Sequence, residues 1–214
     1  MKETNIYFIR HGESKANEQK LFLGNGNLDL TEKGVQQAMM TAAYLEDVPA
    51  DFIYSSDLLR AYHTAKCTAD LKEMQIITDK DLREINGGKW EFSPFSSLST
   101  DYPEDFKVWN EDIGHACPTG GESVADLAER FIKAVTAIAE KHQGCNIFIF
   151  SHATPIRTFY TLATGKTLSD LKDIPWPTNA SVTHASYKEG KFTVHAYSTD
   201  HFMKELVTKL PDNI

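Results

Sequence analysis

Two kinds of hydrophobic pattern alternate along the chain. Short, nearly continuous apolar runs are typical of buried strands, whereas stretches in which apolar positions recur every three or four residues are typical of amphipathic helices. Strands are therefore expected at 5–10, 51–54, 75–78 and 146–150. Helices are expected from 31 to near 49, and at 58–71, 122–142 and 155–162. Strands that alternate with helices in this way predict an α/β fold with a mainly parallel sheet and helices on both faces.

Two segments break this alternation. Residues 181–187 and 191–197 alternate apolar and polar positions around a Lys-Glu-Gly turn, which predicts an antiparallel hairpin at the edge of the sheet. Residues 93–121 lose regular periodicity, gather Ser, Pro and Gly with large aromatics, and allow only one or two helical turns near 104–109. We therefore expect a three-layer α/β/α sandwich with a lid or insertion at about 92–120.

Composition fits one globular domain, predicted over residues 1–214. Asp and Glu number 30 against 22 Lys and Arg, which gives a net charge of −8. That charge disfavours nucleic acid and an anionic membrane as main partners, because both require a dominant positive surface. It also argues against anionic small molecules, unless a few arginines form a local positive pocket.

Cysteines and the lengths of the apolar runs bear on location. Cys67, Cys117 and Cys145 form no Cys-x-x-Cys pair and leave an odd count, so a reducing compartment fits better than a disulfide framework or a zinc ribbon. The first apolar run, 6–9, is too short for a secretory leader, and 147–150 is too short to cross a bilayer. The expected location is the cytoplasm.

Candidate chemistry lies where the predicted strands end. In open α/β sheets, ligands collect where strands pass into loops and helices. Arg10 and His11 follow the first strand, His152 follows the strand at 146–150, and Arg60 lies one turn into the helix after 51–54. Convergent guanidinium groups favour a phosphoryl group, since their planar forks bind its oxygens bidentately.

The segment Phe8-Ile9-Arg10-His11-Gly12-Glu13-Ser14 resembles the signature of the histidine phosphatase superfamily, which has the phosphoglycerate mutase-like fold. Further segments match in the order of the family, at 30–38, 56–65, 82–91, 120–123 and 179–183. The resemblance spans roughly residues 5–198. A lone Arg-His-Gly is weak, but ordered blocks with the right residue types are specific.

The resemblance implies a role for each matching residue. His11 would be the nucleophile that forms a phosphohistidine, and Arg10 and Arg60 would hold the phosphoryl oxygens. Their like charge would also lower the pKa of His11 and keep it neutral for attack. His152 would donate to the same oxygens. Glu84 would protonate the leaving oxygen and then activate water.

Three residues complete the expected phosphate site. Asn17 would add a neutral donor, the backbone of Ala153 would add an N–H at a helix start, and Gly24 belongs to the loop over the phosphate. Asn17 has an alternative interpretation as a loop cap only. Each histidine alone would more often be structural, and the remaining ones are expected to be so: His63, His115, His142, His184, His195 and His201.

Other carboxylates compete with Glu84 for the acid role. Glu91, Glu13 and Glu122 are nearby in sequence, but the Leu-x-Glu and Gly-x-Trp context favours Glu84. A metal site built from His11, His152 and Glu84 is an alternative that ranks low, because the arginines would repel a cation. Neither a metal nor a cofactor is expected.

The family contains mutases and phosphatases, and two features separate them here. The segment 85–91 after Glu84 resembles the phosphatase branch, and the separation of 68 residues between Glu84 and His152 leaves no room for the longer insertion of the mutases. Between 93 and 120 the basic side chain is Lys107, whereas acidic and aromatic residues abound. A second anionic group on the substrate would need extra cations, so the non-phosphate part is expected to be neutral or apolar. Alternatively the aromatics only pack the lid, and second-anion contacts could come from Lys15, Lys20 and Lys89.

Departures from the family pattern affect the pocket. The loop 24–30 lacks the usual Asp-x-Pro-Leu order, so its shape over the phosphate is expected to differ. Phe92 replaces a usual glycine and is expected to narrow the pocket beside Glu84. Ala153 replaces a common glycine, with little expected effect.

The resulting hypothesis is a metal-independent phosphomonoesterase of the histidine acid phosphatase type, acting on a small phosphorylated metabolite. A homodimer is compatible with it. The alternatives are a cofactor-dependent phosphoglycerate mutase and a non-catalytic module that binds phosphorylated ligands.

Overall fold

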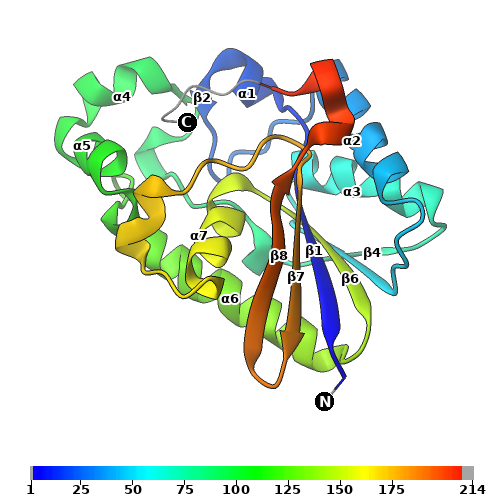
Figure 1. The fold of residues 1–214 in the computed structure, drawn as a ribbon. Helices are drawn as coiled ribbons and strands as arrows, with labels where there is room; N and C mark the ends of the chain where they lie inside the picture. Colours follow the sequence, from blue (N-terminus) through cyan, green and yellow to red (C-terminus); the bar gives the residue numbers. More distant parts are fainter. Residues whose placement is uncertain (1, 209–214) are drawn as a thin grey trace.

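A six-stranded sheet forms the centre of the molecule in the computed structural model, which describes residues 2–208 (Figure 1). Its strand order is β4-β3-β6-β1-β7-β8. The strands are β1 (Thr4–Arg10), β3 (Phe52–Ser55), β4 (Ile76–Thr78), β6 (Asn146–Ser151), β7 (Val182–Lys188) and β8 (Lys191–Thr199). The first four are parallel, whereas β7 and β8 pair antiparallel at one edge. The predicted mainly parallel sheet with an edge hairpin is confirmed.

The central strands β1 and β6 are apolar between their polar ends because helices cover both of their faces. β1 pairs with β6 from Asn5 opposite Asn146 to Arg10 opposite Ser151. Between these ends the side chains of both strands are almost all buried, which explains the continuous apolar runs in the sequence.

Helices lie on both sides of the sheet, with α2 and α3 on one side and α6 and α7 on the other (Figure 1). Their bounds are α2 (Glu32–Tyr44), α3 (Leu59–Leu71), α6 (Val124–Lys141) and α7 (Ala153–Ala163). Phe131 of α6 and Phe159 of α7 pack with Phe8 in one core. Ala65 of α3 packs with Ile9 in the other. The predicted three-layer sandwich is confirmed.

Local chemistry explains where these helices begin. The Thr31 hydroxyl accepts a hydrogen bond from the Gly34 N–H at 3.0 Å, and Ser123 caps α6 in the same way. α2 ends at Tyr44, short of Pro49, so the predicted end of this helix was too late.

The segment predicted as a lid or insertion, residues 92–120 and called the lid below, contains more structure than its composition predicts. β5 (Ser93–Pro94) pairs with β2 (Leu21–Phe22), and two helices follow, α4 (Phe95–Asp101) and α5 (Pro103–Glu111). The predicted helical turns lie within α5. α4 was missed because it is rich in Ser and Thr and buries only Leu98.

Short elements complete the described part of the chain. α1 (Lys15–Gln19) follows the first strand, and the 3₁₀ turns are Lys80–Leu82, Gly88–Trp90, Ile113–His115, Leu168–Asp173 and His201–Leu206. That 1–214 form one domain stays a prediction, since residues 1 and 209–214 lie outside the described part.

The parallel strands end at a common edge of the sheet. Past the end of β1, the His11 N–H donates to the Ser151 carbonyl at 3.0 Å, and past the end of β3 the Ser56 N–H donates to the Phe150 carbonyl at 2.9 Å. Because His152 follows β6 directly, these connections bring three strand ends and their polar side chains together.

Candidate active site

His11 lies at the end of β1 and has one defined tautomer. Its Nδ1 lies 2.7 Å from the Gly12 carbonyl, which can only accept, so Nδ1 carries the proton and Nε2 carries the lone pair. The tight turn needs glycine at position 12, because a Cβ there would lie 2.3 Å from the Gly34 carbonyl oxygen. The imidazole therefore presents an unprotonated nitrogen from a fixed backbone position.

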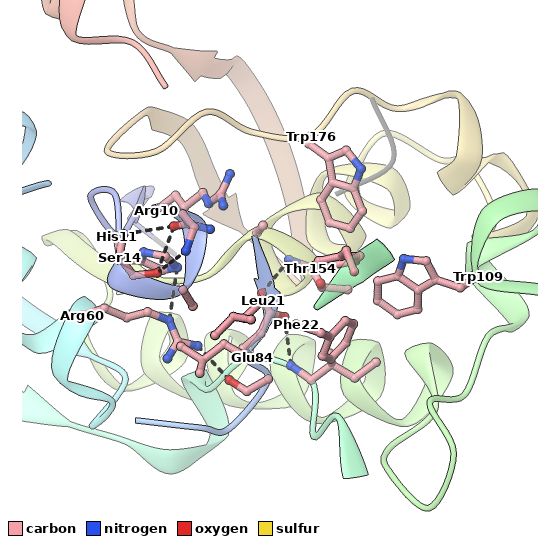
Figure 2. Close-up of a pocket in the computed structure, with 17 residues that line it drawn as sticks. Arg10, His11, Ser14, Leu21, Phe22, Arg60, Glu84, Trp109, Thr154 and Trp176 are labelled. Carbon is pink, nitrogen blue, oxygen red and sulfur yellow. Dashed lines mark hydrogen bonds between the residues drawn. The ribbon is translucent and has the colours of Figure 1, made fainter. Parts of the chain in front are cut away.

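The surroundings of His11 hold it neutral. Burial lowers its pKa well below the usual value, and the charges of Arg60 and then Arg10 lower the pKa further. The Arg60 Nε–H donates to His11 Nε2 at 3.3 Å (Figure 2). A neutral imidazole with a lone pair directed at a guanidinium is suited to attack an electrophile that the guanidinium also binds.

Arg60, in the first turn of α3, organises the loop that follows β2. Its Nη1 and Nη2 donate to the Gly26 and Gly24 carbonyls at 2.9 and 2.7 Å. Gly24 has a φ of +52°, a conformation that favours glycine. The Glu91 carboxylate accepts from the N–H groups of Asn25 and Gly87, which ties the loop to the segment after Glu84.

Two cations are buried here without an ion pair among the described residues. Arg10 donates to the Pro177 carbonyl at 2.5 Å, and its Nε–H has no partner in the described part of the chain. Burial lowers the pKa of Arg10 and of Arg60 to about 10, so both stay charged at neutral pH. Buried charges normally have a counter-charge. The pair is therefore suited to bind an anion.

His152 lies against His11, with ring centroids 5.2 Å apart. Its Nε2 lies 2.8 Å from the Ser56 hydroxyl, and its Nδ1 is buried without a partner among the described residues. Burial lowers the pKa of His152 well below the usual value, and the charge of Arg60 adds to this. Ser56 was not among the predicted site residues. Its place directly after a strand is the signal that could have indicated this second contact.

Glu84 is the carboxylate that lines the pocket, among the described residues. Its Oε1 accepts from the Ile85 N–H at 2.9 Å, and its Oε2 accepts from the Thr154 N–H at 3.3 Å. The competing carboxylates have other partners: Glu91 holds backbone N–H groups, Glu122 pairs with Arg130, and Glu13 pairs with Lys33.

Asn17 both caps a helix and lines the pocket. Its Oδ1 accepts from the Ser14 N–H at 3.0 Å and from Asn179 Nδ2 at 3.1 Å. The capping contacts occupy the amide oxygen, so the amide NH₂ is the group left to serve a ligand. Gly24 and Ala153 also line the pocket, and Ala153 is the first residue of α7.

The remaining histidines lie away from the pocket, with partners of their own. His63 pairs with Asp29 at 2.7 Å, and His142 bonds the Tyr54 hydroxyl at 2.8 Å. The others have contacts as well: His115 with Asp112, His184 with Asn5, His195 with Ser186, and His201 with Tyr44.

The lid contributes aromatic rather than charged groups to the pocket. Phe95 and Trp109 line it, whereas no lid carboxylate and no lysine of residues 2–208 does so. Trp90, Leu98 and Trp109 also form a separate core, so the packing interpretation of the aromatics applies too.

Phe92 does not line the pocket, and the expectation that it narrows the pocket beside Glu84 is wrong. Its side chain is 52% exposed and covers Gly26 from outside. Its φ of +64° is a left-handed conformation, which explains why glycine suits this position.

Comparison with known proteins identifies the class. Residues 6–200 match the family model of the histidine phosphatase superfamily (branch 1), and the chain belongs to this superfamily. It is 32% identical to phosphoserine phosphatase 1 of Hydrogenobacter thermophilus over 77% of this chain and 78% of that protein. It is 30% identical to the probable phosphoglycerate mutase GpmB of Escherichia fergusonii over 87% and 86% of the two chains. The solved structure of Bacillus stearothermophilus YhfR is similar with a TM-score of 0.89 and 30% identity, over 93% of this chain and 99% of that one.

The described residues provide neither a membrane-spanning helix nor a cluster of metal ligands. No helix within residues 2–208 is long and apolar enough to cross a membrane. No group of three His, Cys, Asp or Glu side chains in the same range has the geometry to hold a metal ion, and this includes His11, His152 and Glu84.

Proposed function

We propose that the chain is a phosphatase of the histidine acid phosphatase type that hydrolyses small phosphomonoesters through a phosphohistidine on His11, without a metal. One observation carries the proposal: the His11 Nε2 lone pair is directed at Arg60, beside a second buried arginine, Arg10, with no carboxylate paired to either among residues 2–208. The similarity to a phosphoserine phosphatase supports hydrolysis of small monoesters.

In the first step His11 Nε2 attacks phosphorus, an N–P bond forms and the P–O bond to the alcohol breaks. The alcohol oxygen leaves with the electron pair of that bond and takes a proton from Glu84. Arg10 and Arg60 bind the phosphoryl oxygens while charge spreads over them, which lowers the barrier. The neutral amide of Asn17 and the Ala153 N–H at the start of α7 add donors without adding charge.

In the second step water attacks phosphorus from the side of the departed alcohol. Glu84 takes a proton from the water, and the N–P bond breaks with return of its electron pair to His11. Inorganic phosphate leaves and the site is restored. Both steps use Glu84 at one position, which its two backbone hydrogen bonds maintain.

The second candidate is phosphoglycerate mutase activity, which the similarity to GpmB favours. It would require cations for a carboxylate or a second phosphate. Lys15, Lys20 and Lys89, the candidates for such contacts, do not line the pocket. We therefore rank phosphatase activity first. A primed conversion of 3-phosphoglycerate to 2-phosphoglycerate, without net phosphate release, would reverse this order.

Trapping of the intermediate tests the proposal. Quenching without acid during turnover of ³²P-labelled monoester should leave label on His11, and His11→Ala should abolish both label and phosphate release. His63→Ala is the matched control, since His63 lies outside the pocket and should keep both. Full activity of His11→Ala would refute the mechanism. Vanadate binding without turnover of any monoester would favour the non-catalytic module. A small phosphorylated metabolite as partner and a cytoplasmic location stay predictions.

A further inference from the structure

The pocket has two chemically different ends. Figure 2 shows Arg10, His11 and Arg60 at one end, and Trp109 and Trp176 at the other. The wall at the tryptophan end is apolar, since Trp109 and Trp176 belong to one packed cluster with three other residues that line the pocket: Phe22, Ile85 and Phe95. Since the phosphoryl group belongs at the arginine end, this wall faces the leaving alcohol.

Trp176 is held on one side by a buried arginine. The Arg157 guanidinium carbon lies 4.1 Å from the centroid of the Trp176 ring. Arg157 is itself fixed, since its Nε and Nη2 donate to the Ile174 and Leu171 carbonyls, each at 2.7 Å. A cation over one face of an indole is favourable and fixes the plane of the ring. Arg157 therefore covers one face of the indole and fixes the orientation in which Trp176 lines the pocket.

The backbone on either side of Trp176 is fixed as well. The Tyr197 hydroxyl donates to the Pro175 carbonyl at 2.7 Å, and Arg10 donates to the Pro177 carbonyl at 2.5 Å. The second contact links this segment to a residue of the phosphate end. A side chain ordered before binding loses little conformational entropy when a ligand packs against it.

Trp109 supplies an unused donor on the same wall. Its side chain is 4% exposed, and its Nε1–H has no hydrogen-bond partner among the residues that the structure describes. The two indole rings are nearly parallel, with centroids 6.4 Å apart, and in Figure 2 the nitrogen of Trp109 lies on the side toward Trp176. Buried N–H groups are almost always paired, so this one is suited to an acceptor on a ligand.

We propose that Trp109 and Trp176 recognise the leaving group, and that the preferred substrates are phosphomonoesters whose alcohol carries an uncharged, planar aromatic ring with a hydrogen-bond acceptor. The ring packs against Trp176, and the acceptor binds Trp109 Nε1–H. The proposal rests on the proposed phosphatase function and adds the class of alcohol. It also explains why this wall contains neither a lysine nor an additional arginine among the described residues.

Benzyl and cyclohexylmethyl phosphate test the ring, because both are esters of primary alcohols of similar size. We expect kcat/KM of the parent enzyme to be about 3- to 10-fold higher for benzyl phosphate. Trp176→Leu should bring the ratio near one, and Trp176→Phe should restore part of it. Phe92→Leu, an aromatic change outside the pocket, is the matched control and should leave the ratio unchanged.

Trp109→Phe tests the donor, because it keeps a ring and removes the N–H. We expect kcat/KM to fall about tenfold for at least one of the three pyridylmethyl phosphates and to change less than about twofold for benzyl phosphate. No response for any isomer would overturn the role of the N–H.

A ratio near one in the parent enzyme, or a ratio unchanged in Trp176→Leu, would overturn the preference for aromatic rings. The parent ratio decides this even if Trp176→Leu fails to fold. Failure of the phosphatase function looks different: none of the esters is hydrolysed, or hydrolysis survives His11→Ala.

Discussion

Arg60→Met is the substitution that most directly tests the charge of the site. Arg60 is 2% exposed and donates to the Gly24 carbonyl, the Gly26 carbonyl and His11 Nε2 at 2.7, 2.9 and 3.3 Å. Methionine keeps an unbranched apolar side chain and removes the positive charge with all its N–H donors. The variant therefore separates the effect of the charge on stability from its effect on turnover.

The effect of Arg60→Met on stability is the difference between two free energies of similar size: the cost of burying the Arg60 charge, which the variant relieves, and the hydrogen bonds to the loop carbonyls, which it loses. Burial lowers the pKa of Arg60 from its ordinary value to about 10, and a shift of this size corresponds to roughly 3 kcal/mol against the charged form in the folded protein. Because the folded-state pKa lies below the unfolded one, the penalty is present throughout neutral pH. The two bonds to loop carbonyls together stabilise by about 3–6 kcal/mol. We expect Arg60→Met to lower the free energy of unfolding by no more than about 3 kcal/mol.

Turnover should change far more. Loss of one preorganised donor to a developing charge slows catalysis by about 10²–10³-fold, and the loss of charge beside His11 also raises the pKa of this proposed nucleophile. We expect kcat for benzyl phosphate to fall about 10³-fold. Initial-rate kinetics and urea unfolding measure the two effects. Arg83→Met is the control, since Arg83 pairs with Asp57 outside the pocket. A kcat within about tenfold of the parent, or a stability loss above about 5 kcal/mol, would refute the reasoning.

Two further predictions concern Glu84 and the buried histidines. Glu84→Gln should lower kcat by about 10²–10⁴-fold with little change in inhibition by phosphate. Glu91→Gln should keep kcat, because one Glu91 oxygen accepts the N–H groups of both Asn25 and Gly87, and glutamine retains an oxygen there. Equal losses of kcat in the two variants would refute Glu84 as the acid. Folding lowers the pKa values of His11 and His152, so the unfolded chain binds protons first as the pH falls. The free energy of unfolding should therefore decrease once the pH drops below about 6.5, the ordinary pKa of histidine, by up to about 2.7 kcal/mol per pH unit. Urea unfolding between pH 7 and 5 checks this, and a double His11→Ala, His152→Ala variant should have a flatter profile.

Much of the fold was predictable because buried parallel strands have a distinctive sequence pattern. The apolar runs of β1 and β6 are continuous, since both faces are covered, and the polar residues that follow them must meet at one edge of the sheet. The structure accordingly brings His11, Arg60 and Glu84 together in one pocket, and the buried ring of His152 lies against His11 behind it.

The other wall of the pocket could not be predicted in this way. α4 and the β2–β5 pair are short, and their stability comes from contacts between segments far apart in sequence. Trp176 lies in an irregular segment with no periodic signal. The orientation of the Trp176 ring depends on Arg157 of α7, whose guanidinium lies over the ring. Arg157 also donates hydrogen bonds to the Leu171 and Ile174 carbonyls, in the segment that leads to Trp176. Such a side chain acquires its role only once tertiary structure is formed.

The net charge of −8 and an anion-binding pocket are compatible because the two act over different distances. Surface carboxylates are screened by salt within about 8 Å at physiological ionic strength. Arg10 and Arg60 are buried, so their field inside the pocket is screened much less. The lid carboxylates do not line the pocket and cannot oppose them at close range. Under the proposed function, discrimination against a second anion comes from the lack of further cations on the aromatic wall among residues 2–208, rather than from repulsion by the lid. Adding a positive charge there, as in Phe95→Lys, should therefore improve turnover of doubly anionic monoesters relative to benzyl phosphate.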